Sequence, residues 1–155
     1  MFDLISDYPA FEFTIVLFLG ALLGSFTTAV IYRTRHNQSW VWNKSHEHEA
    51  RSFCPSCQHV LSVKDLVPIL SWLLQRGRCR YCKTPIAKSY LYTEIALIVV
   101  VLFIYAFLGL SLHSLSIVML SPFVVSQGIL MIQYKTISKF LLSIIAVGVL
   151  LVLFP

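Results

Sequence analysis

Four long apolar stretches, separated by polar connections, dominate the pattern of residues along this chain. They cover residues 13–32, 91–110, 114–133 and 140–154. An α-helix of about 20 residues rises about 30 Å, which is the thickness of the hydrocarbon core of a bilayer. The fourth stretch has only about 15 residues, so it would span a thinned region or let Lys139 extend to the interface. The pattern predicts an all-α polytopic membrane protein with about four transmembrane helices.

The composition supports this interpretation. The chain has 155 residues, of which 57% are hydrophobic and 12% are charged, whereas an ordinary soluble domain is about 25% charged. A soluble enzyme, a disordered protein and a DNA-binding domain are therefore disfavoured, and we predict no nucleic-acid partner despite the net charge of +5. A signal peptide is disfavoured too, because Asp3, Asp7 and Glu12 precede the first stretch and no base does.

The basic residues are concentrated in one connection. Ten of the twelve Lys and Arg residues lie from Arg33 to Lys88, and the other two are Lys135 and Lys139. Cytoplasmic loops of membrane proteins carry such an excess, so we predict a cytoplasmic loop and two extracytoplasmic termini. The chain then divides into a tail with transmembrane helix 1 (residues 1–32), a cytoplasmic zinc-binding loop (33–90) and transmembrane helices 2–4 (91–155).

Zinc is predicted from four cysteines within this loop. They form two C-x2-C pairs separated by 21 residues, namely Cys54, Cys57, Cys79 and Cys82. Two such pairs supply the four thiolates of a closed, tetrahedral structural zinc site, which leaves no position open for catalysis. Disulfides, a redox dithiol and free thiols are the alternatives. Disulfides are disfavoured on the reducing side of the membrane.

Two acids near the cysteines are candidate functional residues. Asp65 precedes an amphipathic pattern that predicts a helix over residues 66–75, resting on the zinc subdomain or on the membrane interface. Asp65 would cap this helix or act in chemistry. Glu94 lies at the head of the second apolar stretch, where it would be functional, lie at the interface or pair with Lys88. His46 and His48 lack the spacing of a zinc protease and predict a solvated loop.

These residues together resemble the N-terminal region of the type IV prepilin peptidases of the bacterial inner membrane. The resemblance covers about residues 20–95 and begins at Gly24-Ser25-Phe26. It is most specific over residues 68–73 (PILSWL) and 76–82 (RGRCRYC). It implies a helical membrane protein with a cytoplasmic zinc loop. Members of this family remove the leader of a prepilin and then methylate the new amino terminus with S-adenosylmethionine.

The chain departs from this family at the implied catalytic aspartates. The peptidase needs two carboxyl groups, one ionised to activate water and the other protonated. Met131 stands where the first aspartate would be, residues 95–155 contain neither Asp nor Glu, and a later GxGD motif is absent. Methionine cannot ionise, so we assign no catalytic residue and expect no proteolysis by that mechanism.

Three hypotheses about function remain open, and whether the chain is an enzyme is left open with them. It is a prepilin-processing relative in the inner membrane that has lost proteolysis and has kept prepilin methylation or prepilin binding. Alternatively, it is a non-catalytic membrane scaffold, or a truncated fragment of a full prepilin peptidase. The implied partners are type IV prepilins or the pseudopilins of type II secretion, membrane lipid and a full-length peptidase.

Overall fold

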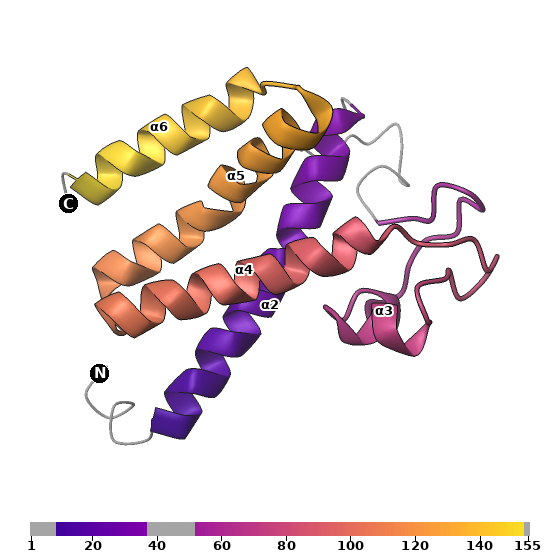
Figure 1. Cartoon of the computed structure of the whole chain (residues 1–155), viewed down its shortest axis with the longest axis horizontal. Helices are drawn as coiled ribbons and strands as arrows, with labels where there is room; N and C mark the ends of the chain where they lie inside the picture. Colours follow the sequence, from indigo (N-terminus) through magenta and orange to yellow (C-terminus); the bar gives the residue numbers. More distant parts are fainter. Residues whose placement is uncertain (1–8, 37–51, 154–155) are drawn as a thin grey trace.

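The computed structural model describes residues 9–36 and 52–153. The predictions for Asp3, Asp7, His46 and His48 lie outside these residues. The elements are α2 (Pro9–Arg35), the 3₁₀ helix η1 (Val63–Asp65), α3 (Leu70–Leu74), α4 (Lys88–Leu108), α5 (Leu112–Tyr134) and α6 (Lys139–Leu153). Helix α2 contacts α4 and α5, and α6 contacts α5. Figure 1 shows α2 crossing α4 and meeting the end of α5, while α3 lies with its loop near the start of α4.

The predicted all-α membrane fold is confirmed. Helices α2, α4 and α5 are each long and apolar enough to cross a membrane. Each begins two to four residues before its predicted start and ends within three residues of its predicted end. Helix α6 forms where the fourth stretch was predicted, but its 15 residues are shorter than those of the other three. The described residues contain no strand, only two isolated bridges, Phe53 with Val60 and Arg78 with Pro85.

Glycine allows α2 and α4 to approach each other closely. A Cβ atom at Gly20 would lie 3.0 Å from the Cα of Ile98, and one at Gly24 would lie 2.8 Å from the Cα of Glu94. Backbone atoms at this distance cannot move aside as the end of a side chain would. The two glycines, spaced four residues apart, therefore form a contact surface of the kind seen between membrane helices.

Replacement of Gly24 by alanine should destabilise the packing of α2 on α4 by about 1–3 kcal/mol, the usual effect of an overpacked contact. Thermal unfolding in detergent micelles measures this. Gly128→Ala is the matched control, because nothing lies within 4 Å of a Cβ at that position. An unfolding midpoint for Gly24→Ala equal to or above that of Gly128→Ala would contradict the prediction.

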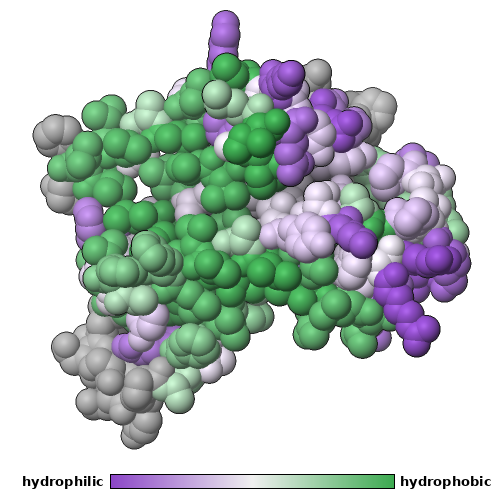
Figure 2. All heavy atoms as spheres, viewed as in Figure 1, coloured by the Kyte–Doolittle hydropathy of each residue, from purple (hydrophilic) through white to green (hydrophobic). Residues whose placement is uncertain are grey.

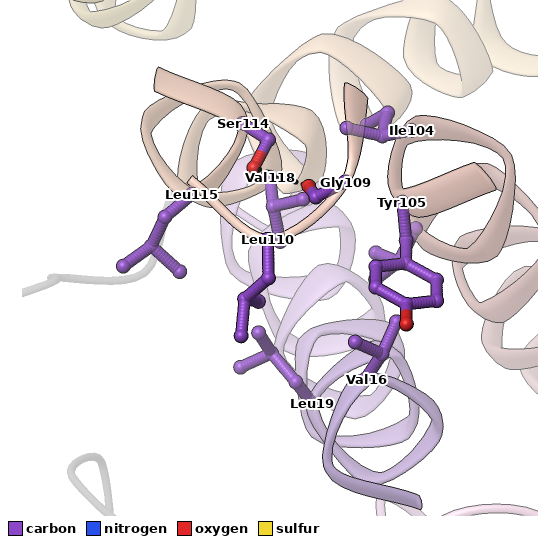
Figure 3. Close-up of a pocket in the computed structure, with 10 residues that line it drawn as sticks. Val16, Leu19, Ile104, Tyr105, Gly109, Leu110, Ser114, Leu115 and Val118 are labelled. Carbon is purple, nitrogen blue, oxygen red and sulfur yellow. Dashed lines mark hydrogen bonds between the residues drawn. The ribbon is translucent and has the colours of Figure 1, made fainter. Parts of the chain in front are cut away.

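Two apolar clusters form the core at opposite ends of the bundle. One contains Val16, Val101 and Val118, and the other contains Val30, Leu130 and Leu141. A cavity of about 20 Å³ beside the first cluster is lined by side chains of α2, α4 and α5 (Figure 3). It has room for about one water molecule. This end of the bundle is therefore packed and offers no space for a substrate.

A proline within α5 is compensated by a neighbouring serine. Pro122 is buried and has no N–H, so the carbonyl of Val118 lacks its usual helical partner. The hydroxyl of Ser121 donates a hydrogen bond to that carbonyl over 2.7 Å. Polar groups buried in a membrane helix need such partners, which explains why α5 stays helical through the proline.

Candidate metal centre

Each cysteine pair lies in a small turn of the same design. The backbone N–H of Cys54 donates to the carbonyl of His59, and the carbonyl of Cys54 accepts from the N–H of Gln58. The second pair repeats this arrangement, because Cys79 bonds Thr84 and Lys83 in the same way. Gln58 and Lys83 both adopt positive φ angles, of 58° and 61°. The two turns thus hold their sulfur atoms in equivalent positions.

These two turns bring the four cysteine sulfurs together. The sulfur atoms of Cys54, Cys57, Cys79 and Cys82 all lie within 4.8 Å of one another. The sulfurs of Cys54 and Cys82 are 3.8 Å apart. Zinc bound to thiolates at about 2.3 Å in a tetrahedron requires sulfur–sulfur distances of about 3.8 Å. The cysteines are free, with no disulfide among them, and they fit a structural zinc ion.

Thr84 favours ionisation of one of these sulfurs. Its hydroxyl lies 3.3 Å from the sulfur of Cys82. Hydrogen bonds from this hydroxyl and from the backbone of Thr84 lower the pKa of Cys82 to about 6. A thiolate is the form of cysteine that binds a metal, so these hydrogen bonds favour metal binding by Cys82.

Asp65 joins three parts of the loop beside the cysteines. One carboxylate oxygen accepts from the backbone N–H and the hydroxyl of Ser62, at 3.1 and 2.7 Å, and from the hydroxyl of Tyr81 at 3.0 Å. The other lies 2.8 Å from Nε of Arg80 and accepts from Gln75 at 3.4 Å. The Asp65 side chain is only 2% exposed. It therefore holds the second cysteine turn against the segment that precedes α3.

These surroundings favour the ionised form of Asp65. Burial by itself would raise the pKa of the carboxyl group. The hydrogen bonds from Ser62 and Tyr81 and the charge of Arg80 outweigh burial and hold the pKa of Asp65 below its usual value. Asp65 thus acts as a buried anion that organises the loop. Asp65 does not cap α3, whose N-cap residue is Ile69; its carboxylate instead accepts from Ser62 at the start of η1.

The predicted helix over residues 66–75 is shorter in the structure. Helix α3 begins at Leu70 and ends at Leu74. Pro68 explains the late start, because the residue before a proline is disfavoured in the helical conformation. His59 stacks on Tyr81 with ring centroids 3.6 Å apart. This stacking links the two cysteine turns without adding a fifth ligand.

Glu94 connects the loop to the membrane helices. Its Oε2 accepts a hydrogen bond of 2.7 Å from the backbone N–H of Ile69. Ile69 has φ 62°, a conformation that a β-branched residue adopts only at a cost of about 1–3 kcal/mol. Of the three alternatives for Glu94, the ion pair with Lys88 is not formed between these described residues. The structure instead gives Glu94 a positioning contact, which no sequence pattern indicated.

A second cavity lies where the loop meets the helices. It measures about 110 Å³ and is lined by α2, α4 and α5, including Tyr32, Tyr90 and Gln133. Arg35 and Tyr134 also line this cavity, and Cζ of Arg35 lies 4.4 Å from the centre of the Tyr134 ring. Sites for cofactor-sized ligands usually measure about 300–1,000 Å³. S-adenosylmethionine does not fit this cavity, so we derive no methyl-transfer step from it.

A helical membrane protein with a four-cysteine metal loop is the class that this fold and site define. Residues 18–108 match the family model described as the bacterial peptidase A24 N-terminal domain. Because this match covers more than half of the chain, the protein belongs to that family. Its cysteines, Asp65 and Glu94 all lie within the matched residues.

Three relatives are described as prepilin-processing enzymes. The prepilin leader peptidase/N-methyltransferase of Myxococcus xanthus is 43% identical over 84 residues, which are 54% of this chain and 23% of the relative. The enzyme of the same name from Vibrio cholerae is 36% identical over 91 residues (56% and 35%). The type 4 prepilin-like proteins leader peptide-processing enzyme of Escherichia coli is 33% identical over 106 residues (61% and 39%).

The matched region is therefore well under half the length of each of these relatives. No solved structure matches the chain at a significant level.

Proposed function

We propose that this chain is a bacterial inner-membrane module of prepilin processing that binds prepilins or pseudopilins without cleaving them. The family match over residues 18–108, which contains the four clustered cysteines, is the observation that carries this proposal. The relatives named for prepilin processing support prepilins as the substrate class.

The orientation of the module follows from its charges. Loop 33–90 contains ten of the twelve basic residues, so it lies in the cytoplasm with both termini on the other side. Cys54, Cys57, Cys79 and Cys82 bind one zinc ion, which stabilises the folded loop. Four thiolates fill all four positions of the ion, so substrate does not bind to the metal.

We propose that the carboxyl groups of this chain do not carry out proteolysis. Peptide cleavage by two carboxyl groups needs a pair that shares one proton. Asp65 is a buried anion committed to Arg80, and Glu94 is bound to the backbone of Ile69. Residues 95–155 offer no further carboxylate, and Met131 on α5 is 59% exposed. These residues give the module a binding role, and a cooperating chain or segment supplies cleavage.

The purified chain should bind a membrane-embedded prepilin and leave its leader in place. Mass spectrometry of the prepilin after incubation measures cleavage, and co-purification measures binding. A full-length prepilin peptidase is the positive control for the same substrate. Loss of the leader with this chain alone would overturn the proposal that the chain does not cleave prepilins. Absence of binding would favour the alternative of a non-catalytic membrane scaffold that makes no prepilin contact.

N-methylation is tested in a separate sample. Already cleaved pilin and S-adenosylmethionine are incubated with the chain, and the mass of the pilin is measured. We expect no change, since the described cavities are too small for the cofactor. A gain of one methyl group would instead make the chain a methyltransferase whose cofactor site includes residues beyond these cavities.

A further inference from the structure

The loop exposes a segment rich in apolar side chains that the zinc site and the proposed prepilin role do not explain. We call this segment the apolar edge, and it consists of Val63, Leu66, Val67, Leu70, Leu73 and Leu74. All six side chains are exposed, Val63 by 83% and Leu74 by 80%. They all belong to the 12 residues that contain η1 and α3. Apolar residues grouped in this way mark a surface that contacts a partner or a membrane.

The depth of the apolar edge follows from its bond to α4. Ile69, next to Leu70, donates its N–H to Glu94, which is the seventh residue of α4. Six residues of α-helix rise about 9 Å, so Glu94 lies almost two turns beyond Lys88. Helix α4 is 21 residues long, about the length that crosses the hydrocarbon core. The Ile69 backbone is therefore held level with the first turns of a membrane helix.

The surface pattern agrees with this depth. Figure 1 shows α3 close to the start of α4, and Figure 2 shows hydrophobic atoms continuing from the helices onto the near part of the loop. Hydrophilic atoms gather at the far end of the loop in the same view. The loop thus has one side suited to acyl chains and another suited to water.

The charges beside the apolar edge favour an anionic lipid surface as its partner. Lys64, Arg76, Arg78 and Lys83 are all exposed. Asp65 is the one acid among residues 52–88 that the structure describes, and it is buried. The exposed charge of this part of the loop is therefore entirely positive, as in elements that lie on anionic membranes.

We propose that η1 and α3 form a membrane-interface element, with the apolar edge inserted among acyl chains beside α4 and the basic residues at the lipid phosphates. Glu94 is the positioning residue that holds this element at the correct depth. The inference does not depend on prepilin binding, because it rests on the exposed side chains and on the Ile69–Glu94 bond.

The test uses the full zinc-bound chain in vesicles of phosphatidylcholine and phosphatidylglycerol that contain a lipid with a photoactivatable acyl chain. After illumination, adducts are mapped by mass spectrometry. We expect as many adducts on Leu70, Leu73 and Leu74 as on Val99, an exposed residue within α4. Lys83, which is exposed at the cysteine turn, should carry several-fold fewer adducts. Labelling of Val99 without labelling of the apolar edge would overturn the proposal.

Four variants separate insertion from misfolding. Leu74→Glu should reduce acyl-chain adducts on α3 several-fold. Lys88→Leu, at an exposed position outside both cysteine turns, should leave these adducts in place, and both variants should retain zinc. Glu94→Gln keeps a side-chain oxygen that accepts from Ile69, while Glu94→Leu removes it and should shift adducts away from α3. Unchanged labelling in Leu74→Glu would overturn insertion, and protection of α3 only when a prepilin or a second copy is added would assign its surface to a protein.

Discussion

Replacement of Cys79 by serine is expected to abolish stoichiometric zinc binding and to unfold the cysteine loop. Cys79 is 4% exposed, and its sulfur lies within 4.8 Å of the other three sulfurs. Structural zinc contributes about 10–16 kcal/mol of apparent binding free energy in small zinc peptides, which exceeds what a loop of this size gains from its core. Residues 52–87, the part of the loop that the structure describes, bury few apolar side chains, so they cannot compensate for this loss.

Zinc content by elemental analysis and hydrogen exchange of the loop measure the effect of Cys79→Ser. The backbone N–H groups of Leu61 and Cys79, bonded to Ser52 and Thr84, should lose their protection. Helices α2, α4 and α5 should keep theirs, because they pack on one another.

His59→Ala is the matched control, since His59 stacks on Tyr81 and is not among the four clustered ligands. It should retain one zinc per chain. A Cys79→Ser variant that keeps its zinc, or a His59→Ala variant that loses it, would contradict the four-cysteine assignment.

The membrane helices could be predicted from sequence because their signal is local. An apolar run of about 20 residues is decisive by itself, so α2, α4 and α5 were placed to within a few residues. The cysteine cluster was predictable for a similar reason, since two C-x2-C pairs carry their geometry in their spacing. Gly20 and Gly24 let α2 approach α4 closely, but glycines in one helix do not identify the helix that packs on them.

The contacts that hold the loop in place could not be predicted, because they join residues far apart in the chain. Glu94 bonds Ile69 across 25 positions, and Asp65 bonds Tyr81 across 16. Nothing about an isoleucine indicates a positive φ angle, which its surroundings impose. The pattern that predicted a helix over residues 66–75 was correct about which residues are apolar and wrong about where the helix begins, because Pro68 delays it.

Replacement of Asp65 by alanine is expected to destabilise the loop by about 2–4 kcal/mol without removing a zinc ligand. Removing one partner of a buried ion pair usually costs about 3–5 kcal/mol, and the value here is lower because Arg80 is 47% exposed and can turn to water. The hydroxyls of Ser62 and Tyr81 also lose their acceptor. The free energy of opening, obtained from hydrogen exchange at Cys79, measures the loss.

Arg80→Met separates the role of the carboxylate from that of the ion pair. It removes the guanidinium but leaves the hydrogen bonds from Ser62 and Tyr81 to Asp65 in place. Because Arg80 is half exposed, its loss should cost about 1 kcal/mol or less. Equal destabilisation by Arg80→Met and Asp65→Ala would contradict the view that Asp65 organises the loop through several partners.

The pH dependence of the opening free energy provides a second test of the role of Asp65. The folded loop holds the pKa of Asp65 below its usual value, so the carboxylate stabilises the folded state above that usual value and loses this effect as the pH falls through the folded pKa. The difference in opening free energy between the native chain and Asp65→Asn should therefore be the same at pH 7.5 as at about pH 5, with zinc content checked at both. It should narrow only below about pH 4. A difference that already shrinks between neutral pH and about pH 5 would mean that Asp65 is protonated in the folded loop, and that the loop is organised by a neutral acid.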